Sequence, residues 1–136
     1  MRIIFLNTLA LIGALIAGSA VNMGLIMLGA AIVPPPAGVD VTDMESIKAG
    51  MHLFEVQHFI FPFLAHALGT LVGALVVSRL AVTHKFRFAM FVGILFFIGG
   101  VSNIKLLPSP VWFAVLDIVF AYLPMAWLGY KLSKKF

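Results

Sequence analysis

The 136-residue sequence contains no cysteine, and only 10% of its residues are charged. The lack of thiols excludes disulfide bonds, cysteine-ligated metal sites and cysteine nucleophiles. A soluble domain has about 25% charged residues and is about half apolar, whereas 62% of this chain is hydrophobic. So few polar groups cannot cover the surface of a water-soluble fold, and the composition therefore excludes a soluble globular domain.

Several catalytic signatures are also missing. The sequence has no glycine-rich phosphate-binding loop, no HExxH motif and no nucleophile elbow. Its apolar runs contain no cluster of carboxylates of the kind that a two-acid mechanism needs. We therefore predict no catalytic residues and no cofactor, and an enzyme is the less favoured class of function.

Long uncharged runs separated by short polar segments are typical of a polytopic α-helical membrane protein. The first run would be roughly 46 Å long as a helix, more than the roughly 30 Å hydrocarbon core requires. It continues well beyond the small residues Gly18-Ser19-Ala20, so we interpret it as a retained span and not as a cleaved signal peptide. The sequence predicts one all-α domain over residues 1–136, a four-helix transmembrane bundle with spans at about 3–33, 59–77, 88–106 and 111–130.

A polar segment separates the first two spans and follows three prolines, residues 34–36, which end the first helix. Thr42 and Glu45 have the spacing of a capping box. Four apolar residues then recur at helical spacing: Met44, Ile47, Met51 and Phe54. This pattern predicts a short amphipathic helix at about 43–56 that lies in the headgroup region of the outer leaflet.

The basic residues are unevenly distributed between the two ends of the predicted bundle. Seven of the nine lie at the termini and in the loop between the second and third spans. The positive-inside rule then places both termini in the cytoplasm. The net charge of +4 is thus a topology signal, and we expect no nucleic-acid partner. The seven are Arg2, Arg79, Lys85, Arg87, Lys131, Lys134 and Lys135; the other two are Lys48 and Lys105.

Small residues recur at helical spacing in each span. In lipid, helices associate through close packing of such residues, because no hydrophobic driving force brings apolar helices together there. We expect these seams to pack the bundle or to contact a partner. The predicted partners are accordingly the lipid bilayer and either further copies of the chain or a larger membrane complex. The seam glycines are Gly18, Gly69, Gly73, Gly93 and Gly100.

Two ionisable side chains stand out within the spans, His66 in the second and Asp117 in the fourth. Such groups are costly in a membrane and are candidates for function. Both lie roughly 9–10 Å below the outer boundary, so they can pair if their helix faces meet. The pair is either a structural interhelical hydrogen bond or the centre of a pocket that holds a ligand or relays a proton. The uncharged candidates for the same pocket are Asn22, Thr70 and Asn103.

Three residues of metal-binding types are spaced three positions apart in the polar segment: His52, Glu55 and His58. On a continuous helix, however, His52 and His58 point about 120° apart, which suits a single zinc site poorly. We therefore predict no metal, with a site shared between chains as the alternative. A haem or intramembrane enzyme site has only His66 in its favour.

Four stretches carry a family resemblance: residues 34–40 (PPPAGVD), 59–74 (FIFPFLAHALGTLVGA), 83–85 (THK) and 121–129 (AYLPMAWLG). Together they resemble a group of small bacterial four-span inner-membrane proteins to which no activity is assigned. The resemblance implies the bacterial inner (plasma) membrane and adds nothing on mechanism.

Two classes of function are consistent with these patterns. The polar residues within the spans favour a small transporter or channel-like protein whose polar pocket opens to the outside. The glycine seams favour the alternative, a non-catalytic accessory or scaffold subunit that holds a larger partner in the membrane.

Overall fold

The computed structural model describes the whole chain, Met1–Phe136, and its regular structure is entirely helical. Four segments are long and apolar enough to cross a membrane: Arg2–Ile32, Gln57–Leu80, Lys85–Leu106 and Val111–Ser133. The prediction of an all-α chain with four such segments is confirmed. In chain order the elements are α1 (Arg2–Ile32), α2 (Met44–Gly50), the 3₁₀ helix η1 (Met51–Leu53), α3 (Gln57–Leu80), α4 (Lys85–Leu106), α5 (Val111–Phe120) and α6 (Leu123–Ser133).

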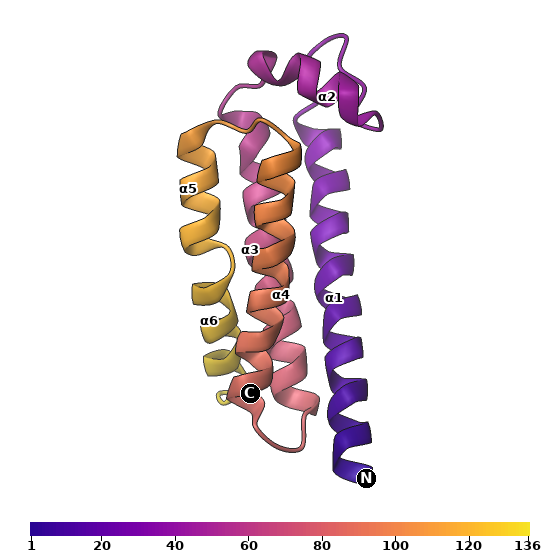
Figure 1. Cartoon of the computed structure of the whole chain (residues 1–136), viewed down its shortest axis with the longest axis vertical. Helices are drawn as coiled ribbons and strands as arrows, with labels where there is room; N and C mark the ends of the chain where they lie inside the picture. Colours follow the sequence, from indigo (N-terminus) through magenta and orange to yellow (C-terminus); the bar gives the residue numbers. More distant parts are fainter.

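α3 is the central helix of the bundle. It packs along α1 on one side and against α4 and α6 on the other, whereas α1 has only a small contact with α4 and none with α5 or α6. Figure 1 shows α1 beside the other helices, with both chain termini and the α3–α4 loop at one end. The α2 segment lies across the opposite end. The two ends of the bundle are called the terminal end and the α2 end below.

A close contact joins α1 and α3, where Gly18 meets Gly69. A Cβ atom on Gly18 would lie 2.7 Å from the carbonyl oxygen of Gly69, so neither helix has room for a side chain here. Close approach through glycine is the packing mode expected in lipid. The other three seam glycines also contact helices of the same chain: Gly73 lies against Ala14 and Val92, Gly93 against Ala126, and Gly100 against Tyr122.

The terminal half of the bundle has a dense core of small side chains. Helices α1, α3, α4 and α6 all contribute to it, and alanine predominates because it lets the backbones approach closely. This half is therefore tightly closed. The buried residues of this core are Ala10, Ala14, Ala74, Val77, Ala81, Ala89, Val92 and Ala126.

The fourth apolar segment differs from the single helix predicted over residues 111–130. α5 ends at Phe120 and α6 begins at Leu123, so the helix is interrupted at Ala121 and Tyr122. Pro124 is the physical reason, because it has no N–H to donate to the carbonyl of Phe120 and its ring collides with that carbonyl in a continuous helix. In the structure Pro124 occupies the first turn of α6, where proline is tolerated.

The helix predicted over residues 43–56 is shorter, and the predicted capping box is wrong. α2 ends at Gly50, and its cap is Asp43, whose carboxylate accepts a hydrogen bond from the amide of Glu45 at 3.2 Å. Thr42 is already engaged, since its hydroxyl and amide donate to the Asp40 carboxylate at 2.7 and 2.8 Å. Those hydrogen bonds lower the pKa of Asp40, which keeps this turn formed in the ionised state.

Candidate ligand-binding site

The two ionisable side chains of the spans meet between α3 and α5. Nδ1 of His66 lies 2.9 Å from Oδ1 and 3.0 Å from Oδ2 of Asp117. Asp117 is only 1% exposed, while the His66 side chain is 16% exposed. A carboxylate so fully removed from solvent requires hydrogen-bond donors, and His66 supplies one when its Nδ1 is protonated.

Tyr122, which was not among the pocket residues predicted from the sequence, is the second donor. Its hydroxyl lies 2.7 Å from Oδ2 of Asp117, and its ring stacks on the His66 ring with 5.8 Å between centroids. Gly100 of α4 leaves the space that the tyrosine ring occupies, and Tyr122 is 1% exposed. These three residues, His66, Asp117 and Tyr122, are called the His–Asp–Tyr cluster below.

The interruption of the fourth segment makes this cluster possible. In a continuous helix, residues five positions apart point roughly 140° away from each other. Asp117 and Tyr122 are five apart, and yet their side chains are hydrogen-bonded because the chain leaves the helical path at Ala121. Pro124, which causes the break, therefore positions the phenol against the carboxylate. The signal in the sequence was a proline in the middle of an apolar run.

The cluster can hold or release one proton. A carboxylate paired with an imidazolium is electrically neutral, as is a carboxylic acid paired with an imidazole. Loss of a proton leaves one negative charge on Asp117, which the O–H of Tyr122 and the N–H of His66 both stabilise.

The cluster borders a cavity of about 480 Å³ between α1 and α4, called the lateral cavity. Its polar lining combines the cluster with side chains from the two flanking helices, and the remaining lining is leucine, phenylalanine and glycine. It opens toward the outside of the bundle, since Ser19 and Gly99 on its border are exposed. The polar residues that line it are Ser19, Asn22, His66, Asn103 and Tyr122.

A second cavity of about 280 Å³, the roofed cavity, lies between the cluster and the α2 end. His66, Asp117 and Asn103 line it at the cluster. The α2 and η1 segment covers it with apolar side chains, so the stripe predicted from the sequence faces the bundle at three of its four positions. Those three residues are Ile47, Met51 and Phe54.

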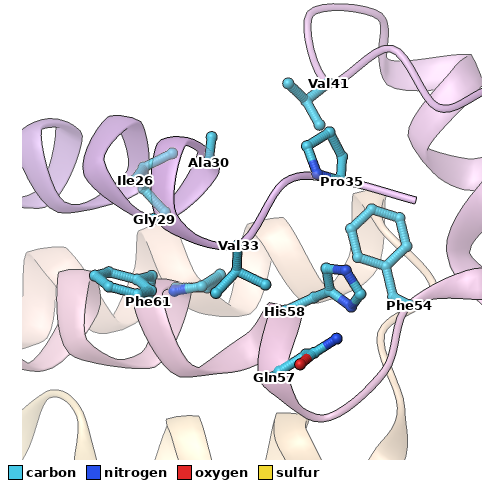
Figure 2. Close-up of a pocket in the computed structure, with 11 residues that line it drawn as sticks. Ile26, Gly29, Ala30, Val33, Pro35, Val41, Phe54, Gln57, His58 and Phe61 are labelled. Atoms are coloured by element: carbon cyan, nitrogen blue, oxygen red, sulfur yellow. The ribbon is translucent and has the colours of Figure 1, made fainter. Parts of the chain in front are cut away.

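The third cavity is smaller, about 180 Å³, and lies between the end of α1 and the start of α3. Figure 2 shows it, with Phe54 and His58 beside each other on one side and Ile26 and Phe61 on the helices. We call it the rim cavity. It adjoins the roofed cavity, with which it shares Ile26, Phe54 and His58.

The structure brings together four of the five pocket residues predicted from the sequence. Asn22 and Asn103 line the lateral cavity with His66, and Asp117 lines the roofed cavity. Thr70 is set apart, because it is fully buried and its hydroxyl donates to the carbonyl of His66 at 2.8 Å within α3. Its contribution is therefore to the helix turn that carries His66.

His52, Glu55 and His58 do not converge within the chain. Nδ1 of His58 accepts a hydrogen bond from the amide of Glu55 at 2.9 Å, and the Glu55 carboxylate accepts one from Gln57 at 3.1 Å. No group of three or more histidine, aspartate or glutamate side chains lies close enough to hold a metal ion. These residues instead shape the start of α3.

The chain was also compared with known proteins. It matches no family model, and no curated protein or solved structure is significantly similar to it.

Proposed function

We propose that this chain is a small carrier of the bacterial inner membrane that binds a hydrogen-bonding ligand at the His–Asp–Tyr cluster and couples its movement to a proton. The observation that carries the proposal is the buried carboxylate of Asp117, which is held by two donors beside a helix break and lines the roofed cavity. Ionisable groups inside membrane spans are expensive and are typically functional. Interrupted helices near the bilayer midplane form the binding sites of many transporters.

A carrier is favoured over an open channel by the difference between the two halves of the bundle. The three cavities lie around the cluster and toward the α2 end. The terminal half is closed by alanine and valine side chains, with glycines such as Gly73 packed against neighbouring helices. Passage of a ligand therefore requires a rearrangement, and the break between α5 and α6 is the natural hinge for it.

Proton coupling follows from which groups face the cluster. α3 contributes His58 as a second titratable residue of the roofed cavity, whereas α1 and α4 contribute only the neutral groups of Ser19, Asn22 and Asn103. No lysine or arginine lines any of the three cavities, so no fixed positive charge neutralises Asp117. The charge of the site is then set by the protons on the cluster and on His58.

The proposed orientation places the terminal end in the cytoplasm and the cavities toward the outside. Seven of the nine basic residues lie in the two terminal segments and in the helix turns that flank the α3–α4 loop. Figure 1 shows the two chain termini and this loop at one end of the bundle. This asymmetry is the topology signal of inner-membrane proteins. In this orientation α2 lies at the outer surface, over the roofed cavity.

The accessory-subunit alternative required a glycine seam that is free to bind a partner helix. Gly69 and Gly73, the glycines of α3 expected to hold a partner, are packed against α1 and α4 of the same chain. They are therefore not free to receive a helix from another protein. We retain only the carrier as the proposed function.

Proton movement provides a test that does not require the ligand to be known in advance. Wild-type protein is reconstituted in liposomes that contain a pH-sensitive dye, and fractions of bacterial metabolite and lipid extracts are added outside. We expect at least one fraction to change the internal pH. Asp117→Asn and His66→Ala should reduce that response to the level of protein-free vesicles, because Asn keeps the shape of the carboxylate but cannot exchange its proton.

The matched control is Ser102→Ala. Ser102 is exposed on α4 and lines none of the three cavities, and its hydroxyl donates only to the carbonyl of Ile98 in its own helix. This variant should respond as the wild type does. An equal response in wild type and Asp117→Asn, or no response to any fraction in the wild type, would overturn the carrier proposal.

A further inference from the structure

The cavities around the cluster are lined mainly by apolar side chains, and most of their polar side chains lie in the lateral cavity and at the cluster. In the rim cavity most of the lining is apolar, and in the roofed cavity the polar side chains are outnumbered by isoleucine, leucine, phenylalanine, methionine and valine. Sugars, amino acids and ions need polar partners on many sides when they leave water. A ligand that fills this space is therefore mostly apolar and carries one small hydrogen-bonding group.

Hydrogen-bonding groups without a partner mark where that polar group would bind. The side-chain amides of Asn22 and Asn103 make no hydrogen bond within the chain, and Nε2 of His66 is free because Nδ1 holds Asp117. All three residues line the lateral cavity. Asn22 is half-buried and Asn103 is exposed at the border of this cavity. A side-chain amide both donates and accepts hydrogen bonds, so these groups favour a ligand that can do the same.

The charge of the lining restricts the polar group further. A carboxylate, phosphate or sulfate would require a lysine or arginine, and none lines the three cavities. A fixed cation would face the imidazole of His66 and compete with it for Asp117. An uncharged hydroxyl or carbonyl group fits the lining best.

The opening of the lateral cavity indicates the route. It lies between α1 and α4, which barely touch, and Ser19 on its border is near the middle of α1 and therefore at bilayer depth. The direct path from the α2 end is covered by Ile47, Met51 and Phe54. The lateral opening thus lies at the depth of the bilayer, whereas apolar side chains of the α2 and η1 segment lie over the roofed cavity.

We propose that the ligand is an uncharged amphiphile, such as a long-chain or isoprenoid alcohol, that enters the lateral cavity sideways from the membrane. Its hydroxyl binds between Asn22 and Nε2 of His66, and its apolar part extends into the roofed and rim cavities (Figure 2). This inference rests on the proposed carrier function and specifies its substrate class.

Photolabelling in liposomes tests the substrate class directly. The probe is a long-chain alcohol with a diazirine in its chain, compared with an alkyl sulfate and an alkyl trimethylammonium of the same chain length. We expect saturable labelling of peptides around Asn22 and Gly99 by the alcohol, displaced by the unlabelled alcohol. Asn22→Leu should weaken apparent binding roughly tenfold, the equivalent of one lost hydrogen bond.

Two glycine variants separate occupation of the cavity from general lipid contact. Gly99 lines the lateral cavity with no atom within 4 Å of its Cβ position, so Gly99→Leu fills the opening without a clash. Gly24 of α1 has equally open space and does not line the cavity, so Gly24→Leu is the control. Saturable labelling should be lost in Gly99→Leu and retained in Gly24→Leu.

The outcomes distinguish this inference from the proposed function. Three results would each overturn the proposal of an uncharged amphiphilic ligand. They are labelling that does not saturate, equal labelling by the charged probes, and unchanged labelling of Gly99→Leu. If the proton response to a water-soluble fraction still depends on Asp117 in that case, the carrier function stands with a different substrate. Saturable labelling without any Asp117-dependent proton response would instead indicate a lipid-binding protein, and it would overturn the proposed carrier function.

Discussion

At the scale of single residues, Asn7 is the clearest polar contact outside the cluster. It is 7% exposed, its amide nitrogen donates to the Thr83 hydroxyl at 2.8 Å, and its carbonyl oxygen accepts from the amide of Val82 at 2.9 Å. It thereby ties α1 to the turn between α3 and α4. α1 has few other contacts beyond α3, so this tie fixes the terminal end of the helix.

We expect Asn7→Ala to destabilise the fold by about 1–3 kcal/mol, because the amide of Val82 and the hydroxyl of Thr83 both lose their partner. The measurement is the thermal unfolding midpoint in mild detergent. Thr8→Ala is the neighbouring control, since the exposed hydroxyl of Thr8 donates only to the carbonyl of Ile4 in α1. The importance of the contact would be refuted if both variants unfolded at the same temperature as the wild type.

The sequence identified His66 and Asp117 because ionisable residues are rare in apolar runs. It could not identify Tyr122, since the contact of this tyrosine with Asp117 depends on the exact path of the chain after Ala121. Asn7 was missed for a similar reason, because its partners lie 75 and 76 positions away. Contacts of this kind depend on how helices are rotated about their axes, which one sequence does not define.

At the scale of elements, the packing of α6 on α3 depends on Gly129, which was not among the seam glycines predicted from the sequence. A Cβ on Gly129 would lie 2.5 Å from the carbonyl oxygen of Leu71 and 3.0 Å from the backbone nitrogen of Leu75. Both are backbone atoms of α3, so neither can move aside. Gly13 of α1 is the opposite case, with no atom within 4 Å of its Cβ position.

These two glycines predict opposite effects of the same substitution. Gly13→Ala should stabilise the chain by up to about 1 kcal/mol through helix propensity. Gly129→Ala should destabilise it by about 1–3 kcal/mol, because the added methyl separates α6 from α3. The unfolding midpoints of the two variants, measured in the same detergent, should lie on either side of the wild-type value. A shift in the same direction would contradict the close packing of α6 on α3.

The elements themselves were largely predictable, and the two exceptions have local causes. Apolar run length located the four segments, since each must match the bilayer. Pro124 indicates the break at Ala121 and Tyr122. Hydropathy averaged along the segment does not reveal it, because the residues around the break are apolar too. Thr42 and Asp43 could each cap the start of α2. Asp43 does so, because the hydroxyl and amide of Thr42 are already hydrogen-bonded to Asp40.

At the scale of the whole molecule, one half of the bundle is packed and the other half is hollow. Alanine, glycine and valine close the terminal half, while larger side chains with gaps between them surround the cavities in the other. A bundle built this way holds its helices together at one end and leaves freedom for movement at the other. This arrangement could not be read from composition, because apolar content is high in both halves.

The orientation of this asymmetric bundle determines which side of the membrane the cavities face, and the lack of native cysteine makes it directly measurable. Ala37 lies in the exposed loop at the α2 end, and Phe136 is the last residue at the terminal end. In intact bacterial cells, a membrane-impermeant maleimide should label Ala37→Cys, whereas Phe136→Cys should react only after permeabilisation. The positive-inside rule predicts this result, because it places the end with the excess of basic residues in the cytoplasm. Labelling of Phe136→Cys alone in intact cells would reverse the orientation, and the roofed cavity would then lie on the cytoplasmic side.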